Sequence, residues 1–166
     1  MLRAFAGIAY ANSPTKNDAA LIAVDTNILV YAHREDSPFH EQAFARLESL
    51  ANSKAAWAIP WPCLHEFYSI VTHPRIFNPP SPQHAAIDQV EAWLECPNVH
   101  PIGETASHWG ELCALLVAAK LTGRRVHDAR IAAICIQHGV SELWSADRDF
   151  SAFPTLKARN PCLGQD

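Results

Sequence analysis

The chain has 166 residues, 49% of them apolar, and this length fits one domain with a sizeable core. No apolar run approaches the roughly 18 residues of a membrane span, so we expect a soluble protein that is not embedded in a membrane. The net charge of −4 is unlike that of strongly basic nucleic-acid binders, but four acids reserved for cations would account for it, so charge does not exclude RNA.

The cysteines and the first residues bear on the compartment. Five cysteines form no CxxC pair, which argues against a disulfide framework and a cysteine zinc site and favours a reduced, cytoplasmic protein. Residues 4–11 (AFAGIAYA) resemble a signal peptide only weakly, since one basic residue precedes a very short apolar stretch. We expect residues 1–20 to be a disordered extension or the result of a mis-assigned start, followed by a domain over 21–161 and a tail over 162–166.

Apolar runs and helical periodicity alternate along the chain. Strands are predicted at residues 21–24, 55–59, 99–102, 142–146 and 155–159. Helices are predicted at residues 38–52 with Ser37 as N-cap, from 60 to about 73, at 83–95, at 106–121, and from 127 or 128 to a C′ residue at Gly139. The proline-rich residues 74–82 are predicted to form a loop. This alternation indicates an α/β fold with a parallel sheet.

Two aspartates each follow an apolar, strand-like run. Asp25 follows residues 21–24, and Asp147 follows residues 142–146. Because ligands bind beyond the carboxyl ends of the strands in open α/β sheets, both acids are expected at the same functional edge. Each also has an ordinary structural explanation. Asp25 would cap a helix that begins at Ile28, and Asp147 would start a turn in its Asp-Arg-Asp segment.

Glu66 and Asp128 lie on predicted helices. The neighbours of Glu66 three and four residues away are Pro62, Cys63, Ser69 and Ile70. An acid on such a weakly polar face is unusual unless it is paired or binds a metal, and the structural alternative is a buried partner for a His or Arg. Asp128 opens its helix, where a cap or first-turn acid contributes roughly 0.5–2 kcal/mol, so Asp128 alone is no evidence for a site.

The four acids together indicate more than each alone. They are far apart in sequence and meet only through the fold. At about 4 Å and an effective dielectric near 20, each like-charged pair would cost about 4 kcal/mol, a penalty that a divalent cation reverses. Hard oxygen ligands suit Mg²⁺ or Mn²⁺, and such an ion activates water and stabilises charge on a phosphate. Phosphodiester hydrolysis is therefore the predicted chemistry.

Each of the four acids lies in a distinctive segment. The first two segments are residues 24–32 (VDTNILVYA) and 65–75 (HEFYSIVTHPR). The other two are residues 127–133 (HDARIAA) and 144–150 (WSADRDF), the last followed by Asn160 and Pro161. In this order the segments resemble the four motifs of PIN-domain nucleases of the VapC toxin type. Four motifs in the family's order, over about residues 21–161, make this resemblance highly specific.

The resemblance implies a fold, an activity and a metal site. PIN domains have a parallel sheet flanked by helices and cleave RNA through acid-bound Mg²⁺ or Mn²⁺, as one or two ions. By similarity, Asp25 and Asp128 are the principal metal ligands. Glu66 and Asp147 complete the acidic, catalytic site and orient the attacking water.

The resemblance also implies supporting residues and partners. Thr26 and Asn27 support the turn at Asp25, and Ser145 is a hydrogen-bond donor behind it. VapC-type members are usually homodimeric toxins neutralised by a VapB-type antitoxin. The RNA substrate is a transfer RNA, a ribosomal RNA or a messenger RNA.

Other polar residues give weaker signals. Asp149 is either a fifth acid that binds a metal through water or a turn residue. The arginines proposed to bind substrate phosphate are Arg75, Arg130 and Arg148. Beside Asp128, Arg124 and Arg125 pair with that acid or contact phosphate. His65-Glu66 begins like the zinc motif HExxH, but position 69 is Ser, so the second ligand is missing.

A second functional class stays open. The chain is either an RNA-cleaving enzyme or a binding module, namely an acidic-pocket signalling domain or a PIN-like protein that binds RNA or a partner without cutting. A phosphorylatable receiver domain would need a Lys at a strand end, and no Lys occupies such a place. Intact acids at all four positions favour the enzyme.

Overall fold

Short apolar segments form the strands, and their burial explains their order. The structure is a computed structural model that describes residues 20–164. Its five strands are all parallel, in the order β3-β2-β1-β4-β5. The strands are β1 (Ile22–Val24), β2 (Trp57–Pro60), β3 (Val99–Ile102), β4 (Glu142–Trp144) and β5 (Lys157–Arg159). All four residues of β2 are buried, whereas the edge strands β3 and β5 expose residues, as expected for a sheet covered on both faces.

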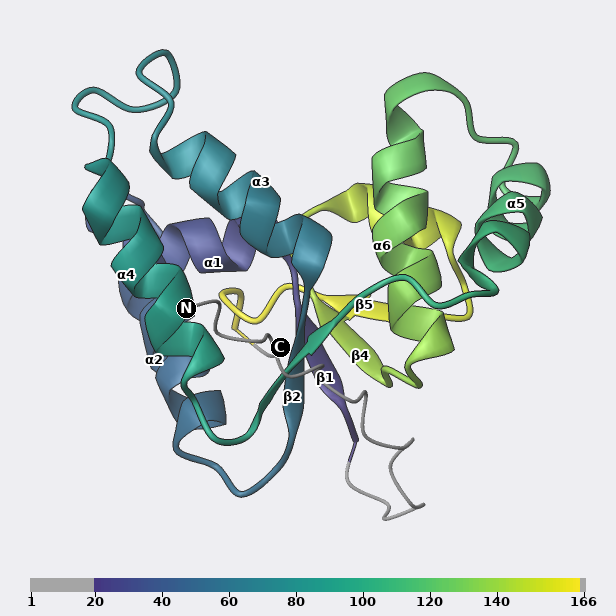
Figure 1. The fold of residues 1–166 in the computed structure, drawn as a ribbon, viewed down its shortest axis with the longest axis horizontal. Coiled ribbons are helices and arrows are strands. Elements are labelled where there is room, and N and C mark those ends of the chain that lie inside the picture. The colour runs from purple at the N-terminus through teal and green to yellow at the C-terminus, as the bar shows by residue number, and fades with distance from the viewer. Residues whose placement is uncertain (1–19, 165–166) are drawn as a thin grey trace, which may run out of the picture.

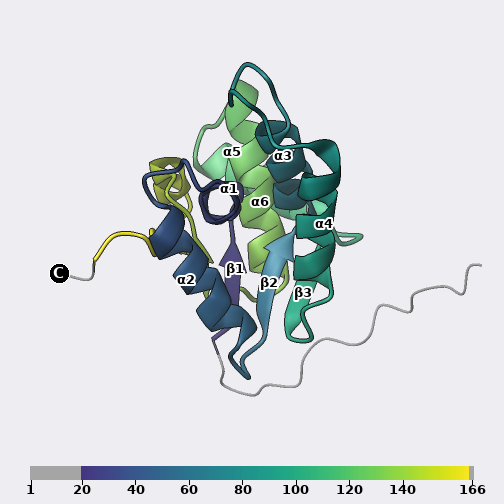
Figure 2. The same ribbon diagram turned by 90° about the vertical axis from the view of Figure 1, so that its left-hand side faces the viewer.

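Helices cover both faces of this sheet. They are α1 (Thr26–His33), α2 (His40–Ala51), α3 (Trp61–Val71), α4 (Gln83–Leu94), α5 (His108–Ala118) and α6 (Val126–Gln137). Figure 1 shows α1, α2 and α4 on one side of the sheet and α5 and α6 on the other. The turned view agrees, with α2 and α4 in front of the strands and α6 behind them (Figure 2). The predicted α/β fold with helix-flanked parallel strands is confirmed.

The core lies between the sheet and these helices. Ile28 and Leu29 of α1, Phe67 of α3 and Ile134 of α6 are fully buried. The ring of Phe67 makes an edge contact with Trp93 of α4, with centroids 4.8 Å apart. Helices α3 and α6 pack directly on β2, and α1 packs against α3, so the residues that follow these strands are held in place.

Several predicted boundaries were wrong, mostly where local capping decides. Helix α1 begins at Thr26 and not at Ile28, because Asp25 accepts a hydrogen bond from the Thr26 backbone N–H. Ser37 is not an N-cap, since its side chain binds Phe39 in a turn and α2 begins at His40. Strand β4 ends at Trp144, two residues before the predicted end.

The predicted end of the fifth helix was also too late. Helix α5 ends at Ala118, and Lys120 takes a left-handed φ of 51° beyond it. Two 3₁₀ turns were not predicted, η1 (Gly123–Arg125) and η2 (Arg148–Ala152). The end of α6 was predicted correctly, with Gly139 at φ 68° just past it, a conformation that favours glycine.

Two predictions fall partly or wholly outside the described residues. The proposed extension over residues 1–20 lies outside them except for Ala20, and residues 165–166 of the tail lie outside as well. None of the helices between residues 20 and 164 has the length and apolar character needed to cross a bilayer.

Candidate active site

A cavity at the carboxyl ends of the strands brings the four predicted acids together. Asp25 follows β1, Glu66 lies in the middle of α3, Asp128 is in the first turn of α6, and Asp147 follows β4. The cavity has a volume of about 130 Å³, and the eight side chains that line it are Asp25, Thr26, Asn27, Glu66, Ile70, Asp128, Ile131 and Asp147. Among the residues that the structure describes, no Lys or Arg lines it.

Asp25 is the most buried of these acids, and its carboxylate is surrounded by donors. Its backbone N–H donates to the Trp144 carbonyl, 2.9 Å away, which holds it against β4. Its Oδ1 accepts from the Thr26 backbone N–H at 2.8 Å. Its Oδ2 accepts from Ser145 Oγ at 2.6 Å and from Asn27 Nδ2 at 2.8 Å. The carboxylate of Asp25 therefore caps helix α1, as considered above, and also faces the cavity.

Asn27 and Ser145 join the ends of β1 and β4. Asn27 Nδ2 also lies 3.1 Å from Ser145 Oγ, and Asn27 Oδ1 accepts from the Ala146 backbone N–H at 2.9 Å. Ser145 Oγ in turn accepts from the Asp147 backbone N–H at 3.0 Å. One hydrogen-bonded network thus fixes the positions of both strand-end aspartates.

Burial dominates the electrostatics of Asp25. The pKa of Asp25 is raised from 3.8 to about 6, chiefly by burial; the hydrogen bonds from Ser145, Thr26 and Cys63 oppose this shift, and the charge of Glu66 adds to it. A carboxylate that is costly to ionise in place is one that would gain from a bound cation.

Glu66 is held by a hydroxyl group and not by a basic residue. Thr26 Oγ1 donates to Glu66 Oε2 at 2.7 Å. The alternative of a buried partner for His or Arg was wrong, because Glu66 is exposed on the cavity side of α3 and no Lys, Arg or His bridges it within residues 20–164. Thr26 therefore contacts two of the four acids, one through its backbone and one through its hydroxyl.

The remaining acids crowd one another. Burial raises the pKa of Asp128, and the charges of Asp147 and Asp149 raise it further, while Arg125 opposes them. Of the two structural roles considered for Asp128, it has the first-turn position in α6, while the cap position belongs to Arg125. Asp147 does begin a turn, because its Oδ1 accepts from the Asp149 backbone N–H at 2.8 Å. Asp149 lies outside the cavity lining, with Oδ1 3.8 Å from Arg125 Nη2.

Sequence reasoning missed Cys63, which lies behind Asp25. Its Sγ donates to Asp25 Oδ1 at 3.5 Å. Burial raises the pKa of the Cys63 thiol well above its usual value, so the thiol stays protonated and acts as a donor. Its position three residues before Glu66 on the same helix was the only signal in the sequence, and that spacing alone does not distinguish a contact with Asp25.

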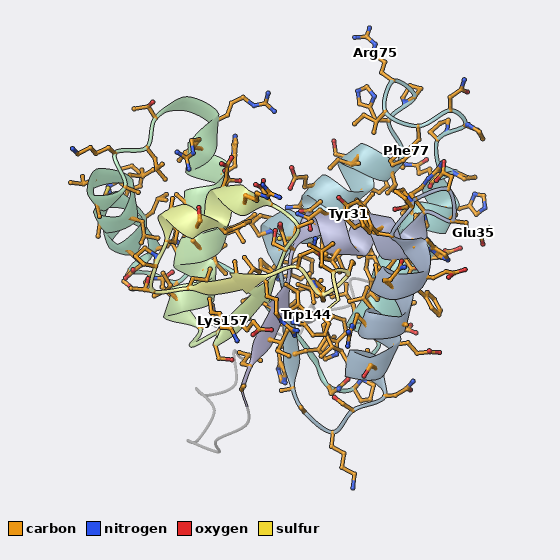
Figure 3. The ribbon with its side chains drawn as sticks, turned by 180° about the vertical axis from the view of Figure 1, so that it is seen from behind. Tyr31, Glu35, Arg75, Phe77, Trp144 and Lys157 are labelled. Carbon is orange, nitrogen blue, oxygen red and sulfur yellow. The ribbon has the colours of Figure 1, made fainter. Side chains whose placement is uncertain are left out.

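The predicted phosphate-binding arginines lie in different places. Arg75 is at the tip of the loop between α3 and α4 and points away from the fold (Figure 3). Arg130, on α6, donates to Glu104 Oε1. Arg148 is exposed at the start of η2, directly after Asp147. None of the three lines the acidic cavity.

The donor set of the cavity fits a hard divalent cation. Four carboxylates and the Thr26 and Asn27 side chains offer oxygen atoms, and Mg²⁺ and Mn²⁺ prefer oxygen ligands. Within residues 20–164, no three Asp, Glu, His or Cys side chains are already drawn together tightly enough to hold a metal ion. The acids therefore share a cavity without forming a closed ligand cage.

Comparisons with known proteins agree on one family. The PIN domain family matches residues 22–156. Ribonuclease VapC48 of Mycobacterium tuberculosis is 30% identical over 140 residues, covering 84% of this chain and 97% of that protein. Ribonuclease VapC43 of the same organism is 34% identical over 145 residues, which cover 87% of this chain and 98% of that protein. The fold is similar to that in VapBC2 from Rickettsia felis bound to a promoter DNA fragment, with a TM-score of 0.59 and 23% identity. The match covers 84% of this chain and 97% of that chain.

Proposed function

This chain belongs to the PIN-domain family, among its VapC-type members, and on that premise we propose that it is a metal-dependent endoribonuclease acting as the toxin of a toxin–antitoxin pair. The substrate is RNA, and the reaction is hydrolysis of a phosphodiester bond. The resident cofactor is Mg²⁺ or Mn²⁺. The relatives named ribonucleases support the reaction, and the chemistry of the cavity supports the metal.

One observation carries the proposal. Four carboxylates from four separate elements line one cavity that no described Lys or Arg enters. Side-chain pairing within the described chain leaves this charge largely uncompensated, since Thr26 and Asn27 are neutral and Asp149 adds a further acid nearby. A structural cluster of this kind would be destabilising without a cation.

The chain's own residues divide the work. Asp25, fixed by Asn27 and Ser145, and Asp128, in the first turn of α6, would hold the ion. When bound, the ion lowers the pKa of a water molecule and stabilises charge that develops on the phosphate. Glu66, held by the Thr26 hydroxyl, would accept a proton from the attacking water.

The first test is cleavage of total cellular RNA by the purified full chain. We expect discrete fragments with Mg²⁺ or Mn²⁺, none with EDTA, and none from the Asp25→Asn variant, because the carboxylate would be needed to hold the ion. Asp88→Asn, an exposed change on α4 away from the cavity, is the matched control and should cleave normally.

The competing function is a PIN-like module that binds without cutting. It predicts that the folded protein gives no fragments with either metal ion, while RNA or a protein partner still binds. Cleavage that persists in EDTA and in Asp25→Asn would instead point to a contaminating nuclease, and would leave the acids without a catalytic role.

We also propose that the toxin is a homodimer that a VapB-type antitoxin neutralises. The exposed apolar side chains of α5 support a protein interface, since Trp109 is 70% and Val117 78% exposed. Light scattering of the purified protein should give twice the chain mass of 18.3 kDa. After addition of the protein encoded beside it, light scattering should show a larger complex, and the RNA cleavage assay should show no activity. Expressed alone, the chain should arrest growth. A monomeric chain that is harmless in cells would contradict the toxin role.

A further inference from the structure

Two arginines lie next to acids of the cavity: the charge of Arg125 acts on Asp128, and Arg148 directly follows Asp147. Lys120, Arg124 and Arg125 lie on the connection from α5 to α6, and Arg148 opens η2. All four are exposed, and together they are called the basic rim. The helices α1 and α3, which form other walls of the cavity, contain no Lys or Arg. The distribution of positive charge around the cavity is therefore asymmetric.

The backbone holds the basic rim in a defined position. Leu121 is buried between the rim residues, and its N–H donates to the Leu116 carbonyl at 2.9 Å. Lys120 and Gly123 have φ values of 51° and 62°, so the chain turns sharply on both sides of Leu121. The η1 turn then runs directly into α6, three residues before Asp128.

Most of the rim's charge is available to a ligand. Within the part of the chain that the structure describes, Lys120, Arg124 and Arg148 form no ion pair. Arg125 has one, at 3.8 Å from Asp149, between side chains that are each about half exposed. Arg130, by contrast, is engaged by Glu104 at 2.5 Å.

We propose that the basic rim binds the phosphate groups next to the bond to be cleaved, so that the RNA strand lies along the α6 and η2 side of the cavity. This inference rests on the proposed function. A chain of net charge −4 with four carboxylates at its cavity repels a polyanion, and exposed cations beside that cavity offset the repulsion. Arginine adds planar, bidentate contacts to phosphate.

The test measures RNA binding by the full chain. Fluorescence anisotropy would follow a 5′-fluorescein-labelled, mixed-sequence single-stranded RNA 20-mer in Mg²⁺, with Asp128→Asn present in every protein to prevent cleavage. Adding Arg124→Ala and Arg148→Ala together should weaken binding about tenfold and reduce the slope of log affinity against log salt by about 1.4, or about 0.7 for each phosphate that is no longer neutralised.

Two further variants separate charge from structure. Lys54→Ala removes an exposed cation from the turn before β2, at the opposite end of the strands, and should leave binding unchanged. Arg124→Lys with Arg148→Lys keeps the charge and should retain most of the affinity. The proposal would be overturned if Arg124→Ala with Arg148→Ala bound the RNA as tightly as Lys54→Ala does. It would also be overturned if Arg124→Lys with Arg148→Lys lost as much affinity as the double alanine variant.

Cleavage kinetics distinguish failure of this inference from failure of the proposed function. With Asp128 intact, the alanine pair should raise KM about tenfold and leave kcat nearly unchanged, because it removes phosphate binding that is present both before and during the reaction. If the natural chain cleaves RNA and the alanine pair has the same KM, only the rim assignment is wrong. If the natural chain neither cleaves nor binds RNA, both proposals are wrong.

Discussion

Replacing Asp128 by Asn will abolish RNA cleavage and raise the melting temperature of the metal-free protein by about 1–3 °C. The gain is expected because Asp147 and Asp149 crowd Asp128, and removing one of three neighbouring negative charges relieves that repulsion. Partial exposure to solvent keeps the gain small. No other described side chain is hydrogen-bonded to Asp128, so the amide loses no partner. Thermal melting in EDTA, together with the RNA cleavage assay, measures both effects.

Asp25→Asn is the informative comparison for this prediction. It should also abolish cleavage, but it should not stabilise the protein, because donors from Asn27, Ser145 and Thr26 all converge on its carboxylate. An amide at this position would turn its own N–H groups toward one of those donors, at a cost of about 1–3 kcal/mol. This cost offsets the stability gained because a charge is no longer buried. A clear drop in the melting temperature for Asp128→Asn would show that Asp128 is structural.

The stability of the metal-free protein should fall as pH rises from about 4 to 6. The pKa of Asp25 is about 6 in the folded chain and near 3.8 when exposed, so the folded state binds the proton more tightly. Ionisation within this window therefore costs the folded state up to about 3 kcal/mol. Urea unfolding in EDTA at several pH values measures this contribution, and Asp25→Asn should lack it.

The same proton should compete with the metal. Below pH 6, Mn²⁺ must displace it from Asp25, so the affinity for Mn²⁺ should fall by about tenfold for each pH unit. Calorimetric titration with Mn²⁺ at pH 5, 6 and 7 measures the fall. An affinity for Mn²⁺ that is constant across this range would show that Asp25 does not control metal binding. A pH dependence of stability that is identical in Asp25→Asn would show that Asp25 does not control the stability of the metal-free protein.

The sequence was sufficient to predict a parallel sheet and the edge at which the acids meet, but not the strand order β3-β2-β1-β4-β5. An apolar run that ends in an acid, as at Asp25 and Asp147, identifies a strand and its functional end together, because a parallel sheet buries both faces of its strands. The spacing of apolar residues identified the helices carrying Glu66 and Asp128. The resemblance to PIN-domain motifs implied that the four acids meet at one site. In the structure, all four line one cavity.

The resemblance implied a Ser145 donor behind Asp25 and support from Thr26 and Asn27, but the other hydrogen bonds that hold the acids could not be predicted from local patterns. The Asn27 bond to the Ala146 backbone, the Thr26 bond to Glu66 and the Cys63 bond to Asp25 join residues 38 to 119 positions apart. Local patterns carry no information on such pairs. Helix periodicity likewise predicted an apolar α5 without showing that part of its surface, at Trp109 and Val117, would lie open to solvent.

The strand order has a consequence for when the site comes into existence. β1 lies between β2 and β4, but β4 is synthesised more than a hundred residues after β1. Ser145 and the Ala146 N–H, which complete the network around Asp25, arrive with it. A chain still emerging from the ribosome therefore carries Asp25 without the Ser145 hydrogen bond, and Asn27 without its bond from the Ala146 N–H. On the proposed function, the chain therefore gains the capacity to cut RNA only after the segment that carries β4 and Ser145 has been synthesised.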